Sequence, residues 1–213
     1  GRFGFFNYSQ PGVTYSGFRA GPIPARDASP CRALLDAGET ADGVYDVATA
    51  NGTVPVLCDM QTDGGGWTMV YKKSAGNAGD PYRQWIDGPL NDGDAALLDR
   101  AAAARDYRSR LVADWPRFDQ VRVEVVDDGA VARTMTFDAA GTSSVSWFAP
   151  HRVVSSDWTD LPTDPEWEDG GGRFFSLDGS GPDSARRWYV NQQWGGCPND
   201  QGWLLLSSAS ICG

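Results

Sequence analysis

Apolar and polar residues alternate most regularly in the middle of the chain. Residues 120–125 read Gln-Val-Arg-Val-Glu-Val, and this period of two is typical of a strand with one buried face. Asp127-Asp128-Gly129 then has the composition of a turn, and a strand-like pattern resumes over residues 130–137. The region therefore predicts a β-hairpin.

The first third of the chain joins one helical run to several β-rich runs. Residues 31–37 predict a short helix. Asn51-Gly52 is a strong signal for a hairpin turn between two strands. The strands expected in this part of the chain lie near residues 43–48, 54–60 and 67–73.

Three consecutive glycines precede Trp67 at the start of the last of these strands. Glycine tolerates positive φ angles and a close approach of other backbone, so Gly64 to Gly66 predict a tight turn between strands that Trp67 anchors. A phosphate-binding loop is the functional alternative. It is disfavoured, because no Lys-Ser/Thr pair and no helix start follow the glycines.

Helical spacing returns over residues 94–113, a stretch rich in Ala, Leu and Arg. The spacing predicts one helix or two short ones, and Pro116 is expected to end them. Residues 155–184 are rich in loop-forming and acidic residues. Strands are expected to resume near residues 187–190 and 203–207.

Length and charge narrow the class of protein. The 213 residues suffice for one large domain or for a domain with an extension, and nine tryptophans with 41% apolar residues can form a core. The net charge of −10 disfavours nucleic acids and anionic membranes as partners, since both would repel the chain. No apolar run approaches the 18 residues that a membrane span needs, so none is expected.

Residues 1–28 differ in composition from the rest of the chain. They hold no helical period, but they carry six aromatic side chains among Gly, Pro and Ser: Phe3, Phe5, Phe6, Tyr8, Tyr15 and Phe18. So many aromatic residues are rare in a disordered tail, and we expect an extended arm. Two alternatives stay open: the arm lies on its own domain, or residues 1–30 join the chain to a neighbouring copy.

The motifs of the first third of the chain resemble a known family. Cys31-Arg32-Ala33-Leu34-Leu35-Asp36, Val56-Leu57-Cys58-Asp59-Met60 and Gly66-Trp67-Thr68 resemble the fibrinogen-like domain, in particular its bacterial-type branch with the pattern YCDxxxxGGGW. The resemblance is strong over about residues 31–73, is weak in the middle of the chain and returns towards the C-terminus. It implies an α+β fold over residues 29–213, with a twisted, mainly antiparallel sheet, short helices and a loop-rich subdomain for ligand and calcium.

The four cysteines allow three pairings. The family resemblance implies the local ones, Cys31 with Cys58 and Cys197 with Cys212. Each bridge would then contribute about 3 kcal/mol in the chain-entropy description. A zinc site is the alternative, and it is disfavoured because the chain has no Cys-x-x-Cys and a single histidine. Disulfides form in oxidising compartments, so we expect a secreted, extracellular protein.

Little in the sequence favours catalysis. His151 is the only histidine, and we expect all four cysteines to be oxidised, which leaves no thiolate nucleophile. Acidic residues lie beside tryptophans in the loop-rich region, but the sequence does not place two carboxylates across a cleft as glycoside hydrolysis requires. We therefore expect no enzyme.

The carboxylates of this region are better suited to binding calcium than to catalysis, because hard cations prefer oxygen ligands. Fibrinogen-like domains carry a calcium loop after a Phe-Ser-x-x-Asp run, which Phe175-Ser176-Leu177-Asp178 matches. The resemblance implies Asp178 and Asp183 as calcium ligands, with Asn199 and Asp200 in reserve. The family's string of further aspartates is replaced here by Gly179-Ser180-Gly181-Pro182.

The segment from Trp194 to Trp203 is the expected ligand site. In the family, the second disulfide and its aromatic neighbours wall a pocket for acetylated sugars or peptide ends. The ligand-binding residues implied here are Trp194, Asn199, Asp200 and Trp203, which supply aromatic faces and hydrogen-bonding groups. Two functions are therefore expected: a lectin-like recognition module for glycans or acetylated surface groups, or a structural subunit of an extracellular assembly joined through its arm.

Overall fold

The computed structural model describes residues 29–49, 52–77, 79–92, 94, 98–99, 105–159 and 161, and the backbone of five strands beyond them. The elements before the central hairpin are α1 (Pro30–Asp36), β1 (Gly43–Thr49), β2 (Gly52–Asp59), η1 (Thr62–Gly64), β3 (Trp67–Thr68), β4 (Tyr71–Lys72), α2 (Pro81–Asp87), β5 (Tyr107–Arg108) and η3 (Arg110–Arg117). The later elements are β6 (Gln120–Asp127), β7 (Ala130–Asp138), η4 (Pro150–Arg152), β8 (Val153–Ser156), β9 (Glu168–Asp169), β10 (Gly172–Arg173), β11 (Phe175–Ser176), β12 (Arg186–Gln193) and β13 (Gln201–Ser207).

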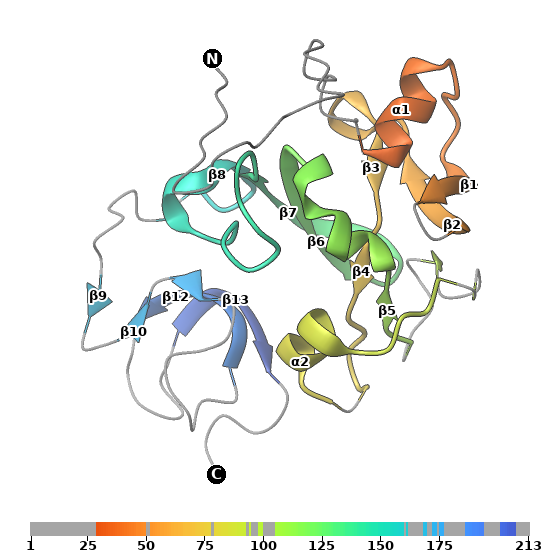
Figure 1. Cartoon of the computed structure of the whole chain (residues 1–213). Helices are drawn as coiled ribbons and strands as arrows, with labels where there is room; N and C mark the ends of the chain where they lie inside the picture. Colours follow the sequence, from red (N-terminus) through yellow and green to blue (C-terminus); the bar gives the residue numbers. More distant parts are fainter. Residues whose placement is uncertain are drawn as a thin grey trace, which may run out of the picture.

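All described strand pairs are antiparallel and the helices are short, so the α+β class expected from the sequence is confirmed (Figure 1). The described strands do not form one continuous sheet, however. They form the sheets β1-β2-β3, β4-β5, β6-β7-β8, β10-β9 and β11-β12-β13. The expected division into an arm, 1–28, and a domain, 29–213, stays a prediction, because the arm lies outside the described residues.

The expected strand over residues 67–73 is divided between two of these sheets. β3 pairs with the end of β2, and the Met69 amide still donates to the Leu57 carbonyl at 3.0 Å. The chain then leaves β2, and the Val70 carbonyl accepts from the Ser109 amide at 2.9 Å before β4 pairs with β5. This segment therefore links two sheets.

Local sequence accounts for the two α-helices. α1 begins with proline in its first turn, where no intrahelical hydrogen bond is lost, and it ends at Asp36, two residues before Gly38, whose φ of +105° permits the closing turn. α2 is capped by Asp80, the residue before its first turn, whose carboxylate accepts from the Tyr82 and Arg83 amides. The predicted helix at 31–37 is thus confirmed within one residue.

Both predicted hairpins are present. β1 pairs with β2 up to Thr49 opposite Gly52, and a disulfide joins Cys31 of α1 to Cys58 of β2, as the family resemblance implies. β6 pairs with β7 through a two-residue turn in which Asp128 and Gly129 have φ of 48° and 79°. Two positive φ angles match the twist of the flanking strands.

The helix, or pair of short helices, expected over residues 94–113 is present only in part: η3 covers the end of this range, and a strand lies before it. β5 occupies Tyr107–Arg108, and η3 begins only at Arg110, after Ser109 has capped it by accepting from the Leu111 amide. The Arg108 guanidinium instead donates to three carbonyls at the end of α2, which belong to Trp85, Ile86 and Gly88. These tertiary bonds override the helical spacing. η3 also continues through Pro116, the residue expected to stop it.

A cluster of aromatic side chains forms the centre of the core. Trp85, Trp115 and Trp147 are nearly inaccessible to solvent, and Phe137 and Phe148 pack against Trp147 with ring centroids 5.2 and 5.4 Å away. Trp115 stacks on Trp147, and the Trp85 ring meets both edge-on. The cluster joins α2, η3, β7 and the loop after β7, so these elements are fixed relative to one another.

Candidate functional site

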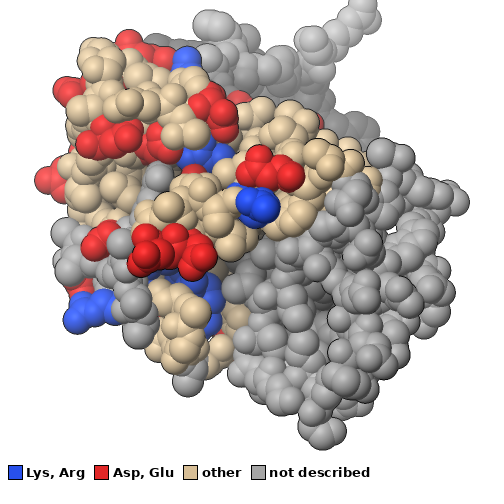
Figure 2. Space-filling model, turned by 180° about the vertical axis from the view of Figure 1, so that it is seen from behind, with Lys and Arg blue, Asp and Glu red and all other residues tan. Residues whose placement is uncertain are grey.

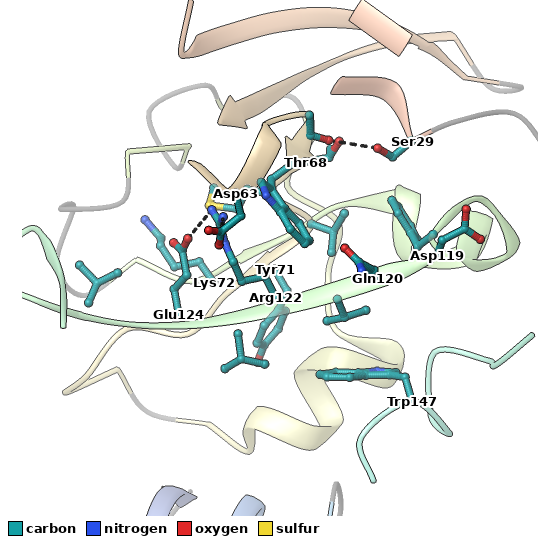
Figure 3. A pocket seen from close by; sticks show the side chains of 18 of the residues that line it. Ser29, Asp63, Thr68, Tyr71, Lys72, Asp119, Gln120, Arg122, Glu124 and Trp147 are labelled. Atoms are coloured by element: carbon teal, nitrogen blue, oxygen red, sulfur yellow. Dashed lines mark hydrogen bonds and ion pairs between the residues drawn. The ribbon is translucent and has the colours of Figure 1, made fainter. Parts of the chain in front are cut away.

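One cavity among the described residues is a groove between two stretches of extended backbone (Figure 3). Residues 65–75, which include β3 and β4, form one wall, and residues 118–124 with Val126 form the other. Its volume is about 1180 Å³, large enough for several sugar rings or a short peptide. β3 and β6 are each the outermost strand of their sheets, so two sheet edges border one cavity.

The two sides of the groove differ in character. Trp147 of the aromatic core lies on one side of the cavity, and the charged side chains of Asp63, Lys72 and Glu124 lie on the other (Figure 3). Trp85 and Trp115 are also among the lining residues. A groove with an apolar side and a charged side suits a ligand whose two sides differ in polarity.

The glycine turn builds one end of the wall. Gly65 has φ 69° and ψ −176°, and a Cβ added there would lie 2.0 Å from the Met60 carbonyl oxygen. At Gly66, with φ 82°, an added Cβ would lie 2.9 Å from Cα of Arg32 in α1. Only glycine fits these two positions, and the close approach that they permit holds Trp67 against the turn, where its Nε1 donates to the Thr62 carbonyl.

A buried arginine joins the two walls beside that turn. The Arg122 side chain, 4% exposed, extends from β6 and donates to Asp59 at 2.7 Å and to Glu124 at 2.6 Å. Its Cζ lies 4.6 Å from the centre of the Trp67 ring, within the range of a cation–π contact. Asp63, 66% exposed, approaches to 3.6 Å from the solvent side.

The buried Asp59 carboxylate is held in its charged form. Burial opposes ionisation, but the Thr62 backbone and side chain, Arg122 and the Gln61 amide all donate to it. Together these bonds outweigh burial and hold the pKa of Asp59 well below its usual range. Asp59 thereby fixes the loop that carries the glycines and orients Arg122.

The opposite end of the same wall is fixed by different contacts. The Tyr71 hydroxyl donates to the Pro81 carbonyl at 3.0 Å, and burial, followed by the charges of Asp106 and Asp80, raises the pKa of Tyr71. Lys73 forms a buried ion pair with Asp106 at 2.7 Å. Burial lowers the pKa of Lys72, whose Nζ donates to the Asp99 carbonyl. These side chains are structural, since each is committed to a contact of the fold.

The described lining of the groove contains neither histidine nor cysteine. His151 lies in η4 and is not among the residues that line it. Within the described ranges, no group of three or more His, Cys, Asp or Glu side chains could hold a metal ion. No helix in the described part of the chain is long and apolar enough to cross a membrane.

The residues expected to bind ligand and calcium are not among those that the structure describes in full. Trp194, Asn199, Asp200, Asp178 and Asp183 fall outside the described residues, as do Cys197 and Cys212. Trp203 lies in β13, of which only the backbone is described. Their roles stay predictions.

Sequence reasoning missed the Arg122 cluster. The glycine motif includes Asp59 and Trp67, but in the sequence Arg122 is only a polar residue of an alternating strand. Asp59 and Arg122 are 63 residues apart, and no local spacing indicates that they meet. The alternation of residues 120–125 did place Arg122 and Glu124 on one face of β6, the face that carries the cluster.

Comparison with known proteins places these motifs in a family. The family of "Fibrinogen beta and gamma chains, C-terminal globular domain" matches residues 27–96, the stretch that holds the disulfide, the glycine turn and one wall of the groove. Residues 27–96 of this chain are therefore similar to a fibrinogen-like domain. Such domains are non-enzymatic binding domains, in agreement with the expectation that the chain is no enzyme.

Two similar proteins show how far the likeness extends. Techylectin-5A of Tachypleus tridentatus is 36% identical over 113 residues, which cover 47% of this chain and 37% of techylectin-5A. Human ficolin-3 is 41% identical over 56 residues, which cover 26% of this chain and 18% of ficolin-3. The matched part of the fibrinogen-like domain thus spans well under half the length of these relatives.

One solved structure is also similar. The fibrinogen-like globe domain of human ANGPTL6 covers 71% of this chain with a TM-score of 0.39 and 18% sequence identity, and 65% of that domain is matched.

Proposed function

We propose that this chain is an extracellular recognition module that binds glycans or acetylated surface groups and catalyses no reaction. The observation that carries the proposal is the alignment with techylectin-5A, a protein named as a lectin, over 113 residues. The groove agrees with the non-enzymatic part of the proposal, because its described lining includes no nucleophile paired with a base.

The disulfide supports the extracellular location. Cys31 and Cys58 are joined, and among the described residues no free cysteine is present. Disulfides persist outside the cytosol, in oxidising surroundings. An extracellular module with this charge would approach neutral or basic partners, because a net charge of −10 repels anionic surfaces.

We place the ligand at the C-terminal loop, on Trp194, Asn199, Asp200 and Trp203. Tryptophan rings stack on the apolar faces of sugars, and amide and carboxylate groups fix the orientation of the ligand. For a calcium ion in the same part of the sequence, the proposed carboxylate ligands are Asp178 and Asp183, with Asn199 and Asp200 in reserve.

The test is a glycan array that pairs each acetylated hexosamine with its non-acetylated counterpart. We expect the full chain to bind acetylated members, and Trp203→Ala to weaken binding at least tenfold. Trp203→Phe keeps an aromatic face and should retain most of the affinity. Val44→Ala, a change at an exposed residue of β1, serves as the control that leaves binding unaltered.

Two results would contradict the proposal. An array without hits, in the presence and absence of calcium, would remove the lectin-like function. Hits that survive Trp203→Ala would remove the site. The structural-subunit alternative, in which residues 1–30 join neighbouring copies, predicts instead a mass above that of the monomer in light scattering.

A further inference from the structure

We propose that the N-terminal arm, residues 1–28, folds back and fills the groove of its own chain as an added β-strand. The first observation is the pairing of the two walls. β3 is the outer strand of β1-β2-β3, β6 is the outer strand of β6-β7-β8, and both edges border the same cavity. Sheet edges present rows of backbone donors and acceptors, which an extended chain can pair.

The two sides of the groove specify the pattern of such a strand. On β6, Val121 and Val123 pack against the aromatic core, whereas Arg122 and Glu124 bond to each other on the opposite face. Side chains of an added strand would alternate in the same way, one set towards Trp85, Trp115 and Trp147 and the other towards the charged side. The groove therefore selects a segment that alternates apolar and polar residues.

The arm contains two segments with this alternation. One is Phe6-Asn7-Tyr8-Ser9, and the other is Val13-Thr14-Tyr15-Ser16. Each offers large apolar side chains at every second position and small polar ones between them. Phenylalanine, tyrosine, valine and threonine are also the residues that sheets favour.

The described chain begins at the groove. Ser29 lines the cavity, and its Oγ donates to the Gly66 carbonyl at 3.2 Å, beside the glycine turn (Figure 3). The residues between Tyr15 and Ser29 span up to roughly 50 Å when extended, which is ample for a return into the groove. Such a tether gives the arm an effective concentration in the millimolar range, far above that of a second copy in dilute solution.

The distribution of charge also favours the N-terminal arm as the occupant of the groove. Residues 1–28 contain three arginines and one aspartate, a net charge of +2, whereas the whole chain carries −10. Acidic side chains also border the groove: Asp63, Asp119, Glu124, Asp128 and Asp138. Of the basic side chains at the groove, Arg122 and Lys73 are already in ion pairs with carboxylates of the fold. The face in Figure 2 shows the same excess of acidic over basic side chains among the described residues.

Photo-crosslinking in the full chain tests the proposal. Phe6 and Tyr15 are replaced, in separate variants, by p-benzoylphenylalanine, and the sites joined after irradiation are mapped by mass spectrometry. We expect links from at least one position to residues 65–75 or 118–126 of the same chain, in protein that keeps the monomer mass. Links found only in covalent dimers, or only to residues outside these walls, would overturn the proposal.

A matched pair of substitutions provides the control. Val126 lines the groove, and Val131, its partner across the β6–β7 pair, is 43% exposed and does not line it. Val126→Asp should lower the yield of these links at least fivefold, and Val131→Asp should leave it unchanged. If Val126→Asp fails to fold, Val154→Asp takes its place, since Val154 borders the groove and is 58% exposed. Equal yields in the folded variants would overturn the proposal.

The proposal does not rest on the lectin-like function. Glycan binding is assigned to Trp194 and Trp203, and the arm to the groove, so either assignment can fail alone. Normal glycan binding without links to the groove walls would refute only the proposal for the arm. Links to the groove walls without glycan binding would refute only the proposed function.

Discussion

Alanine at Gly65 should destabilise the protein far more than alanine at its neighbour Gly64. Both glycines have positive φ, 69° and 86°, so both substitutions carry a conformational cost. They differ in what the new methyl group meets: nothing lies within 4 Å at Gly64, whereas at Gly65 the Met60 carbonyl oxygen would be 2.0 Å away. Gly64→Ala is therefore the matched control for the close contact at Gly65.

The expected magnitudes derive from these contacts. Gly64→Ala should cost about 1–2 kcal/mol, the energy of a left-handed conformation at a residue with a Cβ. At Gly65 the φ and ψ angles fall in a region that is essentially restricted to glycine, which adds about 1–3 kcal/mol. The methyl group must also displace the Met60 backbone, although the Met60 amide is held by Asp42 at 2.7 Å. The sum should exceed about 4 kcal/mol.

Thermal unfolding, followed by tryptophan fluorescence without reductant, measures the difference. For a domain of this size, 1 kcal/mol corresponds to about 2–4 °C in Tm. Gly64→Ala should lower Tm by about 2–8 °C, and Gly65→Ala should lower it further or prevent folding. Equal losses in the two variants, or a Gly65→Ala protein that melts with the wild type, would refute the assigned role of the glycine turn.

Three further predictions concern the charged cluster, the disulfide and calcium. Because the pKa of Asp59 is depressed in the folded state, its contribution to the unfolding free energy is present at neutral pH and is lost as pH falls below about 4, the unfolded value. Asp59→Asn should therefore cost about 2–3 kcal/mol at pH 7 and should make the unfolding free energy fall less steeply between pH 5 and 2. An unchanged slope would contradict this. Replacing Cys31 and Cys58 together by serine should lower the unfolding free energy, measured in urea, by about 3.5 kcal/mol, because the bridge joins residues 27 positions apart. A loss below about 1 kcal/mol would show that the chain between the two positions is ordered without the bridge. Calcium at 100 times its Kd should add about 2.7 kcal/mol of stability, and Asp178→Asn should abolish the gain; superimposable melting curves with calcium and with chelator would remove the site.

Elements that depend on neighbouring residues could be predicted from the sequence. The helix at the first cysteine, the hairpin at Asn51-Gly52 and the turn at Asp128-Gly129 each rest on a few consecutive residues. Their signals are conformational, since proline fixes φ and glycine permits a positive φ, so distant parts of the chain change them little.

Elements that depend on distant residues could not be predicted in this way. The alanine-rich stretch before Arg110 has helical spacing, yet Arg108 bonds to carbonyls of α2 and β5 pairs with β4. The groove likewise needs two strands that lie about fifty residues apart in the sequence. The family resemblance directed attention to Trp194 and Trp203 for the ligand, and neither the composition nor the periodicity of β6 indicated a cavity beside it.

The bond between Asp59 and Arg122 has a consequence for biosynthesis. The family match ends at residue 96, before Arg122, so the recognisable segment lacks the cation that neutralises its own buried carboxylate. At a synthesis rate of about 5–20 residues per second, Arg122 leaves the ribosome roughly 3–13 s after Asp59. During that interval the Asp59 carboxylate and the Trp67 ring beside the glycine turn lack their contacts with Arg122. The segment up to residue 96 thus needs a residue made later to complete its fold, and a chain cut near residue 96 should not fold by itself.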